Sequence, residues 1–290
     1  MIQPFKPYIS RFDKAFKEDH TRHYHLTIRI AMDGFSLVVF SPEKNRFLGL
    51  THFRFPDIDT NSKLSLALDG IAMSNVWISY PFQSVIAMID HPHHALIPKA
   101  LYDEKERGTY LAFNQQYCEN SRIVSDQLKT AESYNIYYLS NLLTEKIKEL
   151  WANARIVHQS SILIESLLIS QRNLDSDKSI FAHIGKNNFD LVWINKDRLS
   201  FFNRFRFHTP EDFIYFILFT LDQLRLNPET LELVLSGQID KGSPYYEIAW
   251  NYIRNIRFAS RNQSFDYSYV LEDLPVYQHM ILYNALQCEL

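Results

Sequence analysis

The chain has 290 residues, enough for two units of roughly 150 residues that each bury a hydrophobic core. Its net charge is −3 and its acidic and basic residues are well mixed, which argues against a nucleic-acid binder that depends on a broad basic patch. Its 2 cysteines show neither metal-ligand spacing nor a disulfide framework, so a reducing, cytoplasmic compartment is expected.

No segment has the pattern of a membrane anchor. Residues 1–22 are polar, are interrupted by Pro4 and Pro7, and lack the apolar run of a signal peptide. The longest apolar stretch, residues 213–221, is too short to span a bilayer. We therefore expect an N-terminal extension over 1–22 and no membrane insertion.

An internal repeat is the most informative feature of the sequence. Residues 26–55 read LTIRIAMDGFSLVVFSPEKNRFLGLTHFRF, and residues 180–207 read IFAHIGKNNFDLVWINKDRLSFFNRFRF. The apolar positions around Phe35 recur 154 residues later at Phe189, and Phe53 recurs 152 residues later at Phe205. The difference is a two-residue deletion in the second turn, and the pattern predicts a duplicated three-strand meander.

The first half is expected to span residues 23–175. Strands are predicted over 23–32, 35–40, 47–55, 84–90, 134–140 and 154–161, and helices over 61–74, 98–107, 142–154 and 162–173. Asn61 or Ser62 is expected to cap the first of these helices. Residues 91–98 are expected to form a loop, and the polar segment 172–178 is the predicted boundary between the halves.

The second half, residues 176–290, repeats the same order of elements. Three strands over 179–207 are followed by a helix that Thr209 caps and Pro210 starts, with Glu211 and Asp212 in its first turn. A strand over 230–238, a helix over 243–255, a short strand over 256–260 and a final helix over 274–287 complete the prediction. Both halves therefore follow the order β-β-β-α-β-α-β.

Two tandem units of this kind resemble the duplicated ribonuclease-H-like fold of the actin and sugar-kinase superfamily. More narrowly, residues 205–224 and 231–253 resemble a family of uncharacterised Bacteroidetes proteins of about this length with an actin-like ATPase fold. The resemblance extends over essentially the whole chain. A more distant likeness is to the cytoplasmic actin-like domains of type II secretion and type IV pilus assembly. The implied fold class is α/β, with actin-like ATPase architecture.

The resemblance implies a place for ATP and magnesium in a cleft between the halves. In this superfamily the first phosphate loop is a β-hairpin with an Asp-x-Gly pattern followed by Ser or Thr. Asp33, Gly34 and Ser36 lie at that hairpin, with the spacing shortened by one residue. The local sequence favours a type I′ turn instead, in which Asp-Gly serves the backbone geometry alone.

The second phosphate loop is expected at Gly185, Lys186 and Asn187, where His183 takes the position of the expected acid. Without that acid, metal-assisted hydrolysis loses one of its supports. The adenosine loop is expected at Ser236 and Gly237. Its second glycine is replaced by Gln238, although Gly242 follows. The chain has only 7 glycines, few for a protein that surrounds phosphates with backbone amides, so the pattern indicates a degenerate site.

Other clusters of reactive residues suggest weaker alternatives. Asp90, His91, His93 and His94 follow a predicted buried strand and, with His20, His23 and His25, offer zinc ligands, but their spacing matches no zinc signature. Cys118 with His91 or His158 would form a nucleophile pair, but nothing in the sequence brings them together. The tyrosines of 134–138 and 245–246 are more typical of core than of base stacking. Arg204, Phe205, Arg206, Phe207 and His208 alternate charged and aromatic residues, which favours the solvent-facing side of an edge strand over a phosphate-binding segment. No metal or catalytic residue is assigned.

These patterns favour a non-catalytic, pseudo-ATPase member of the actin-like fold that acts by binding a protein partner or a second copy of itself. The alternative is a divergent ATP-binding protein or ATPase, with Asp33 on the metal, Lys186 on the phosphates and Gly237 beneath the base. A nucleic-acid-processing accessory is a weaker alternative.

Overall fold

The computed structural model describes residues 6–171 and 179–290. The chain divides into two compact units: the first comprises Met1–Leu163, Gln263–Leu274 and Ile281–Leu290, and the second comprises Ile164–Asn262 and Pro275–Met280. The sequence assigned all of 176–290 to the second half, whereas two segments after residue 262 pack with the first unit. The segment predicted as the boundary, 172–178, lies outside the described residues.

The first unit is built on a seven-stranded sheet with the strand order β1-β4-β3-β2-β5-β9, in which β15 also pairs with β4. These strands are β1 (Ile9–Phe12), β2 (His25–Ala31), β3 (Gly34–Ser41), β4 (Arg46–Arg54), β5 (Ser84–Ile89), β9 (Ala154–His158) and β15 (Asp266–Tyr267). The meander β2-β3-β4 is antiparallel, and β5 and β9 extend it in parallel with β2. The predictions of β2, β3, β4, β5 and β9 are confirmed, although β9 ends at His158 rather than at residue 161. Strands β1 and β15 were not predicted.

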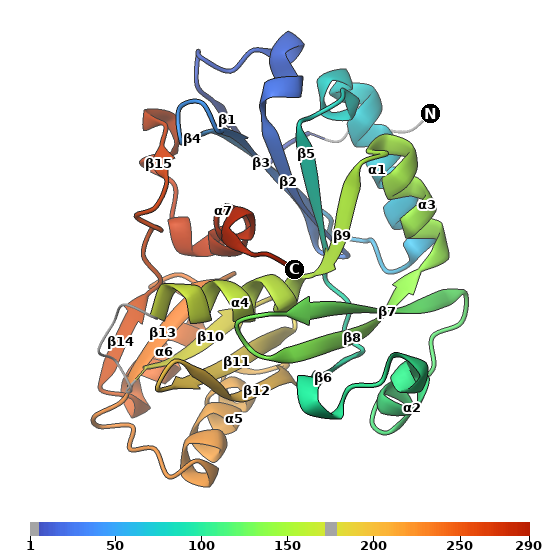
Figure 1. Ribbon diagram of the computed structural model, residues 1–290. Helices are drawn as coiled ribbons and strands as arrows, with labels where there is room; N and C mark the ends of the chain where they lie inside the picture. Colours follow the sequence, from blue (N-terminus) through green and yellow to red (C-terminus); the bar gives the residue numbers. More distant parts are fainter. Residues whose placement is uncertain (1–5, 172–178) are drawn as a thin grey trace. The chain divides into compact units, whose positions relative to one another are not determined.

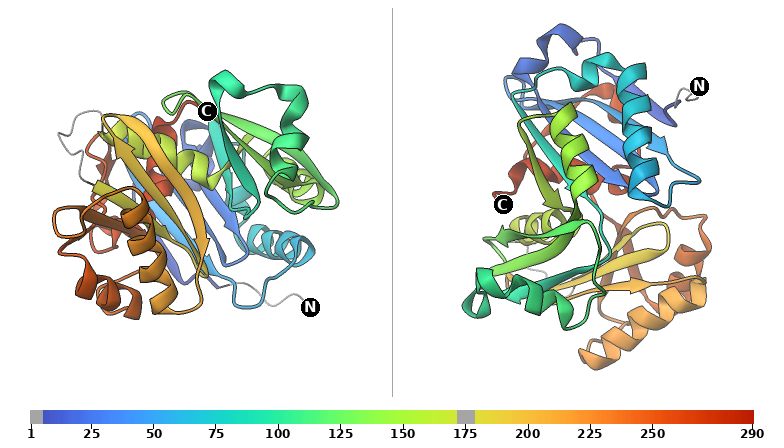
Figure 2. Two further views of the ribbon diagram at one scale, coloured as in Figure 1. Left: turned by 90° about the horizontal axis from the view of Figure 1, so that it is seen from below. Right: turned by 90° about the vertical axis from the view of Figure 1, so that its right-hand side faces the viewer.

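Two helices cover one face of this sheet. Helix α1 (Asn61–Ser74) and helix α3 (Asn141–Leu150) lie side by side (Figures 1 and 2). Their apolar side chains share one core with the strands, which is how an amphipathic helix gains most of its stability in a protein. Helix α1 is capped by Thr60, whose Oγ1 accepts from the backbone N–H of Lys63 at 3.3 Å, rather than by Asn61 or Ser62.

An insertion between β5 and α3 forms a separate three-stranded sheet, ordered β6-β8-β7. It contains β6 (His94–Pro98), α2 (Arg107–Ala112), β7 (Ser121–Leu128) and β8 (Ser133–Ser140). The loop predicted over 91–98 and the helix predicted to start at Pro98 are both wrong. The chain remains extended through Pro98, and α2 begins only at Arg107 after two short 3-10 turns, η3 (Lys99–Leu101) and η4 (Glu104–Glu106).

The second unit has a five-stranded sheet with the order β12-β11-β10-β13-β14. Its elements are β10 (Ser179–Ile184), β11 (Asn188–Asn195), β12 (Arg198–Arg206), α5 (Pro210–Gln223), β13 (Glu232–Gly237), α6 (Pro244–Tyr252) and β14 (Asn255–Phe258). Helices α5 and α6 pack against each other and share one core with the strands. Thr209 caps α5 in a capping box with Asp212, as the sequence predicts.

The two meanders repeat each other down to the residue pairing. Phe35 is paired with Phe53 between β3 and β4, and Phe189 is paired with Phe205 between β11 and β12. Each pair of strands has a register shift at the same place, between Val39 and Phe40 in one and 154 residues later in the other. Because bulges change strand twist and are retained within families, this match supports duplication of a complete meander.

The hairpin at Asp33 is not a type I′ turn. The two residues between β2 and β3 are Met32 and Asp33, and neither Asp33 nor Gly34 has positive φ. Gly34 instead opens β3, where a Cβ atom would lie 2.4 Å from the carbonyl oxygen of Phe53. Positive φ at both turn positions occurs between β11 and β12, at Lys196 (48°) and Asp197 (61°).

The end of the chain is not one helix. The predicted helix over 274–287 is divided into η6 (Val276–Gln278), α7 (Met280–Asn284) and η7 (Ala285–Gln287), because His279 leaves the helical conformation with φ −121°. The ring of Phe47 in β4 lies 5.4 Å from that of Tyr267 and 4.9 Å from that of Tyr283. These aromatic contacts and the pairing of β15 with β4 attach residues 263–274 and 281–290 to the first unit, whereas residues 275–280, with η6, pack with the second.

Replacement of Gly34 by alanine should destabilise the first unit by about 1–3 kcal/mol, because the new methyl group meets the backbone of β4. Gly108→Ala is the control, since its Cβ would meet only a methyl group of Ile123 at 3.8 Å. Urea denaturation followed by Trp77 and Trp151 emission, with Trp193 and Trp250 replaced by phenylalanine, measures this unit. Equal stability of the two alanine variants would contradict the prediction.

Candidate functional site

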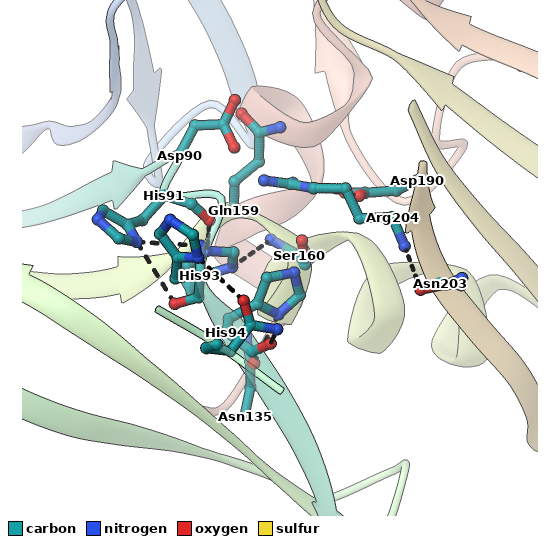
Figure 3. Close-up of polar contacts among 12 residues, drawn as sticks. Asp90, His91, His93, His94, Asn135, Gln159, Ser160, Asp190, Asn203 and Arg204 are labelled. Atoms are coloured by element: carbon teal, nitrogen blue, oxygen red, sulfur yellow. Dashed lines mark hydrogen bonds and ion pairs between the residues drawn. The ribbon is translucent and has the colours of Figure 1, made fainter. Parts of the chain in front are cut away.

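A cluster of polar side chains lies at the carboxyl ends of β2, β5 and β9 in the first unit's sheet. In α/β sheets this edge is where ligands bind. Arg29 lies near the end of β2, Asp33 follows β2, Asp90 follows β5, and Gln159 follows β9 as the first residue of α4 (Gln159–Gln171). Figure 3 shows Asp90 and Gln159 above the histidines that follow β5.

The guanidinium of Arg29 joins these side chains. Its Nη1 lies 2.9 Å from Asp33 Oδ1, and its Nη2 lies 3.4 Å both from Asp33 Oδ2 and from Asp90 Oδ2. Its Nε donates to Gln159 Oε1 at 2.5 Å. The three charged side chains are only 12–13% exposed, so their mutual attraction is weakly screened. The protein's own cation therefore neutralises the carboxylates at this edge.

Ser36, predicted to bind phosphate, has its hydroxyl occupied inside the protein. The side chain is buried, and its Oγ lies 2.7 Å from Nδ1 of His52 across the β3–β4 pair. Burial, together with the nearby charges of Arg29 and Arg54, lowers the pKa of His52 to about 4. His52 is thus neutral at neutral pH, and its bond to Ser36 joins two uncharged groups.

The second unit carries different chemistry at the same three register positions. Arg29, Ser36 and His52 are matched by His183, Asp190 and Arg204. Arg204 forms a bidentate ion pair with Asp190, with Nε to Oδ1 at 2.6 Å and Nη2 to Oδ2 at 2.8 Å. The Arg204 side chain is 9% exposed, so it is not the solvent-facing residue that the alternation in β12 predicted.

This register corrects the prediction that His183 replaces the acid of the second phosphate loop. Asp33 is matched by Asn187, because the backbone N–H of Phe55 donates to the Asp33 carbonyl and that of Phe207 donates to the Asn187 carbonyl. The missing acid is therefore replaced by a neutral amide of the same shape. His183 is buried, and its Nδ1 lies 3.0 Å from Ser236 Oγ.

The remaining predicted residues of the second unit lie at the same end of its sheet. Gly185, Lys186 and Asn187 form the β10–β11 turn, with Lys186 and Asn187 exposed. Gly237 ends β13 with φ +86°, and a Cβ there would lie 2.1 Å from the Ile184 carbonyl oxygen. Its glycine is therefore required by backbone packing, and Gln238, whose N–H donates to that same oxygen, is exposed.

Side chains at these positions do not fit a magnesium-bound nucleotide. Asp33 is bound to Arg29, and Asn187 offers no charge for a metal. The hydroxyls of Ser36 and Ser236 are hydrogen-bonded to histidines. Magnesium prefers carboxylate and phosphate oxygens, and here the available carboxylates are already neutralised.

The histidines after β5 do not form a metal site. Among residues 6–171 and 179–290, no group of three or more His, Cys, Asp or Glu side chains is placed to hold a metal ion. His93 Nδ1 lies 3.0 Å from Gln115 Oε1, and His94 Nδ1 lies 3.0 Å from Asn135 Oδ1 (Figure 3). His25 lies at the opposite, amino end of β2, beside Ser84, while His20 and His23 are exposed in η1 (Glu18–His23).

Other predicted reactive groups are structural. Burial raises the pKa of the Cys118 thiol, which is the opposite of what a nucleophile needs. Tyr137 and Tyr138 are buried in the cores of the first unit, and Tyr134 stacks on Tyr102 at 3.7 Å between ring centroids. Tyr245 and Tyr246 pack against the core of the second unit.

A buried polar cluster connects the insertion to the end of β9. Asp126 accepts hydrogen bonds from the backbone N–H of His158 at 2.8 Å, from Ser161 Oγ at 2.7 Å and from Tyr137 Oη at 3.1 Å. Asn135 Nδ2 donates to the same Ser161 hydroxyl at 2.9 Å. Burial outweighs these bonds and raises the pKa of Asp126 to about 6.

Arg29, Gln159, Asp126 and Asp190 were not identified from the sequence. Each forms contacts with residues distant in the chain, which a local pattern does not show. One signal was present for Arg29: it is a lone charge inside the otherwise apolar strand LTIRIAM. A charge in a buried strand generally has a partner.

The fold and the polar edges define an actin-like ATPase architecture of two ribonuclease-H-like units, as the sequence predicts. The chain belongs to the family described as "Protein of unknown function (DUF3822)", whose model matches residues 13–256. No curated protein matches the sequence. Among residues 6–171 and 179–290, no helix is both long enough and apolar enough to cross a bilayer.

Two solved structures share this fold. A Bacteroides thetaiotaomicron protein with an actin-like ATPase fold and unknown function is 23% identical with a TM-score of 0.79, over 94% of this chain and 99% of that chain. The PilM–PilN type IV pilus biogenesis complex is 12% identical with a TM-score of 0.61, over 92% of this chain and 98% of that chain. The predicted resemblance to both groups is confirmed.

Acidification should stabilise the native protein relative to an Asp126→Asn variant. The folded-state pKa of about 6 lies above the unfolded value of 3.8, so the folded protein holds a proton that the unfolded chain has lost between those pH values. From pH 7 to pH 4 the unfolding free energy of the native protein should rise relative to the variant by up to about 3 kcal/mol. Urea denaturation at several pH values measures this difference, and a difference that stays flat or falls in acid would contradict it.

Proposed function

We propose that this protein is a non-catalytic, cytoplasmic member of the actin-like fold that acts by binding another protein. The observation that carries the proposal is the Arg29 guanidinium bound to Asp33 and Asp90 at the edge where the superfamily places a metal and phosphates. A second support is Asn187, which removes the charge from the matching position of the other unit. Loss of nucleotide chemistry with retention of the fold favours a binding role.

The insertion supplies a surface suited to such a role. Phe113 is 91% exposed, Tyr117 75% and Leu101 69%, all between β6 and β7. The second unit has no matching insertion between β13 and α6 among its described residues. Exposed aromatic side chains are enriched in the centres of protein interfaces. One structural relative is a complex of PilM with PilN, and a protein partner here agrees with that precedent.

The nucleotide part of the proposal is tested by titration calorimetry with magnesium and ATP. With protein at about 100 μM, which detects a dissociation constant in the tens of micromolar, no heat beyond dilution is expected. Asp33→Asn is the matched variant. Heat in the native protein that disappears in Asp33→Asn would contradict the proposal and support the alternative, a divergent ATP-binding protein.

The partner-binding part is tested with a Phe113→Ser, Tyr117→Ser double variant. A protein that co-purifies from native cytosol with the unaltered chain should be lost with this variant and kept with Leu66→Ser, which changes an apolar side chain 57% exposed on α1. Light scattering reports whether the partner is a second copy of the chain. Equal recovery of partners by both variants would exclude this surface, and no partner together with a monomer would contradict the binding role.

A further inference from the structure

The first unit contains a cavity at the opposite edge of its sheet from Arg29. Its volume is about 700 Å³, within the range of small-molecule sites. His25 begins β2 and Ser84 begins β5, and both line the cavity together with Arg155 near the start of β9. Leu286 and residues 288–290 supply another part of the wall.

One end of the cavity is aromatic. The ring of Phe40 lies 5.3 Å from that of Phe265 and 6.2 Å from that of His25. Burial lowers the pKa of His25, whose Nδ1 lies 2.6 Å from Ser84 Oγ, so this end is uncharged at neutral pH. Val85, Ile86 and Leu286 continue the apolar lining. This end of the cavity therefore suits the aromatic or aliphatic part of a ligand.

The other end of the cavity is cationic. Arg155 is half-buried, and its Nη1 and Nη2 donate to the main-chain oxygens of Leu290 at 2.9 Å and Cys288 at 3.3 Å. In the described parts of the chain, no Asp or Glu side chain forms an ion pair with Arg155. Lys129 lies 3.2 Å from Glu289, but these side chains are 55% and 85% exposed, so that pair is weak and exchangeable.

Both cations are thus held by the same short segment. Oxygens of residues 288–290 contact the Arg155 guanidinium and the Lys129 ammonium, although Glu289 is exposed and Leu290 is only partly buried. The contact between Lys129 and Glu289 is readily replaced by another acceptor, because exposed charges gain little from pairing. An arginine fork matches carboxylate and phosphate oxygens especially well. Residues 288–290 therefore occupy the position beside Arg155 and Lys129 where the anionic group of a ligand would bind.

We propose that this cavity binds a small amphipathic anion: a carboxylate or phosphate monoester attached to an aromatic or aliphatic group. The anion replaces Glu289 beside Lys129 and the Leu290 oxygen beside Arg155. The apolar group of the ligand lies against Phe40 and Phe265. Residues 289 and 290 are then competitors that the ligand displaces. The inference is independent of the nucleotide argument, since the two sites occupy opposite edges of the sheet.

The probe for this site is 8-anilinonaphthalene-1-sulfonate, an aromatic anion whose fluorescence rises in apolar surroundings. Saturable binding at one site per chain is expected with the folded, full-length protein. Arg155→Gln should weaken binding about tenfold or more, as expected for loss of a hydrogen bond to a charged group. Lys129→Met leaves the bonds from Arg155 to residues 288–290 in place and should weaken binding about threefold. Arg122→Gln, an exposed change on β7, is the control.

A gain of affinity provides a check that general damage to the fold could not imitate. Glu289→Gln removes the carboxylate that competes for Lys129 and should tighten probe binding about twofold to threefold. A weaker or unchanged affinity in Glu289→Gln would show that residue 289 does not compete with the anion.

Two competing anions identify the class of ligand. Decanoate and phenyl phosphate then compete with the probe, and the one that displaces it identifies the anion as carboxylate or phosphate. Unsaturable binding, equal affinity in Arg155→Gln, Lys129→Met and Arg122→Gln, or displacement by neither competitor would overturn the proposal.

Discussion

The constraint on which the candidate site depends is the charge of Arg29. Three parallel strands end at one edge of the first unit's sheet, and the residues that follow them include two carboxylates, Asp33 and Asp90. Two carboxylates that are only 12–13% exposed repel each other and lose hydration unless a cation lies between them. Metal-dependent enzymes supply that cation as an ion. Here the chain supplies it as a guanidinium, held further by Gln159 from the start of α4.

The duplication shows how one scaffold carries two kinds of polar chemistry. The meanders share their residue pairing and the position of their register shift, so the backbone is the retained part. At one shared set of positions the first unit has a neutral serine–histidine bond, and the second has the bidentate Asp190–Arg204 ion pair. Removing one partner of such a buried pair typically costs several kcal/mol, whereas exchanging the whole pair costs far less. The two units accordingly differ at these positions by a complete pair.

Local patterns were enough to predict the two meanders, their flanking helices and the capping of α5 by Thr209. Alternating apolar residues and capping residues act over a few positions, so they are visible in a single sequence. The type I′ turn at Asp33 was wrong because Gly34 is required by a contact with Phe53, 19 residues away. Of the insertion only β8 was predicted, because β7 mixes polar and apolar residues and Pro98 at the end of β6 indicated the start of a helix. The attachment of residues 263–274 to the first unit depends on pairing with β4, which no local pattern specifies.

The sequence indicated where in the fold the candidate-site residues lie, but not which side chains bind them. Asp33, Gly34, Ser36, Ser236 and Gly237 do lie at strand ends or turns, where the fold places them. Whether those groups are open to a ligand depends on Arg29, four residues from Asp33, and on His52 and His183, whose side chains reach Ser36 and Ser236 from neighbouring strands. Such cross-strand partners are set by register, and register was available only through the repeat.

The most direct test of this account is the side-chain NMR signal of Arg29 in protein labelled with ¹⁵N-arginine. The Nε–H group that donates to Gln159 should exchange slowly with water, and an Arg29→Lys variant assigns its signal by removing it. We predict that this signal is present at neutral pH and does not move when magnesium and ATP are added. A signal that shifts or vanishes in a saturable way when magnesium and ATP are added would contradict the account. It would show that a metal-bound nucleotide displaces the Arg29 guanidinium from its partners.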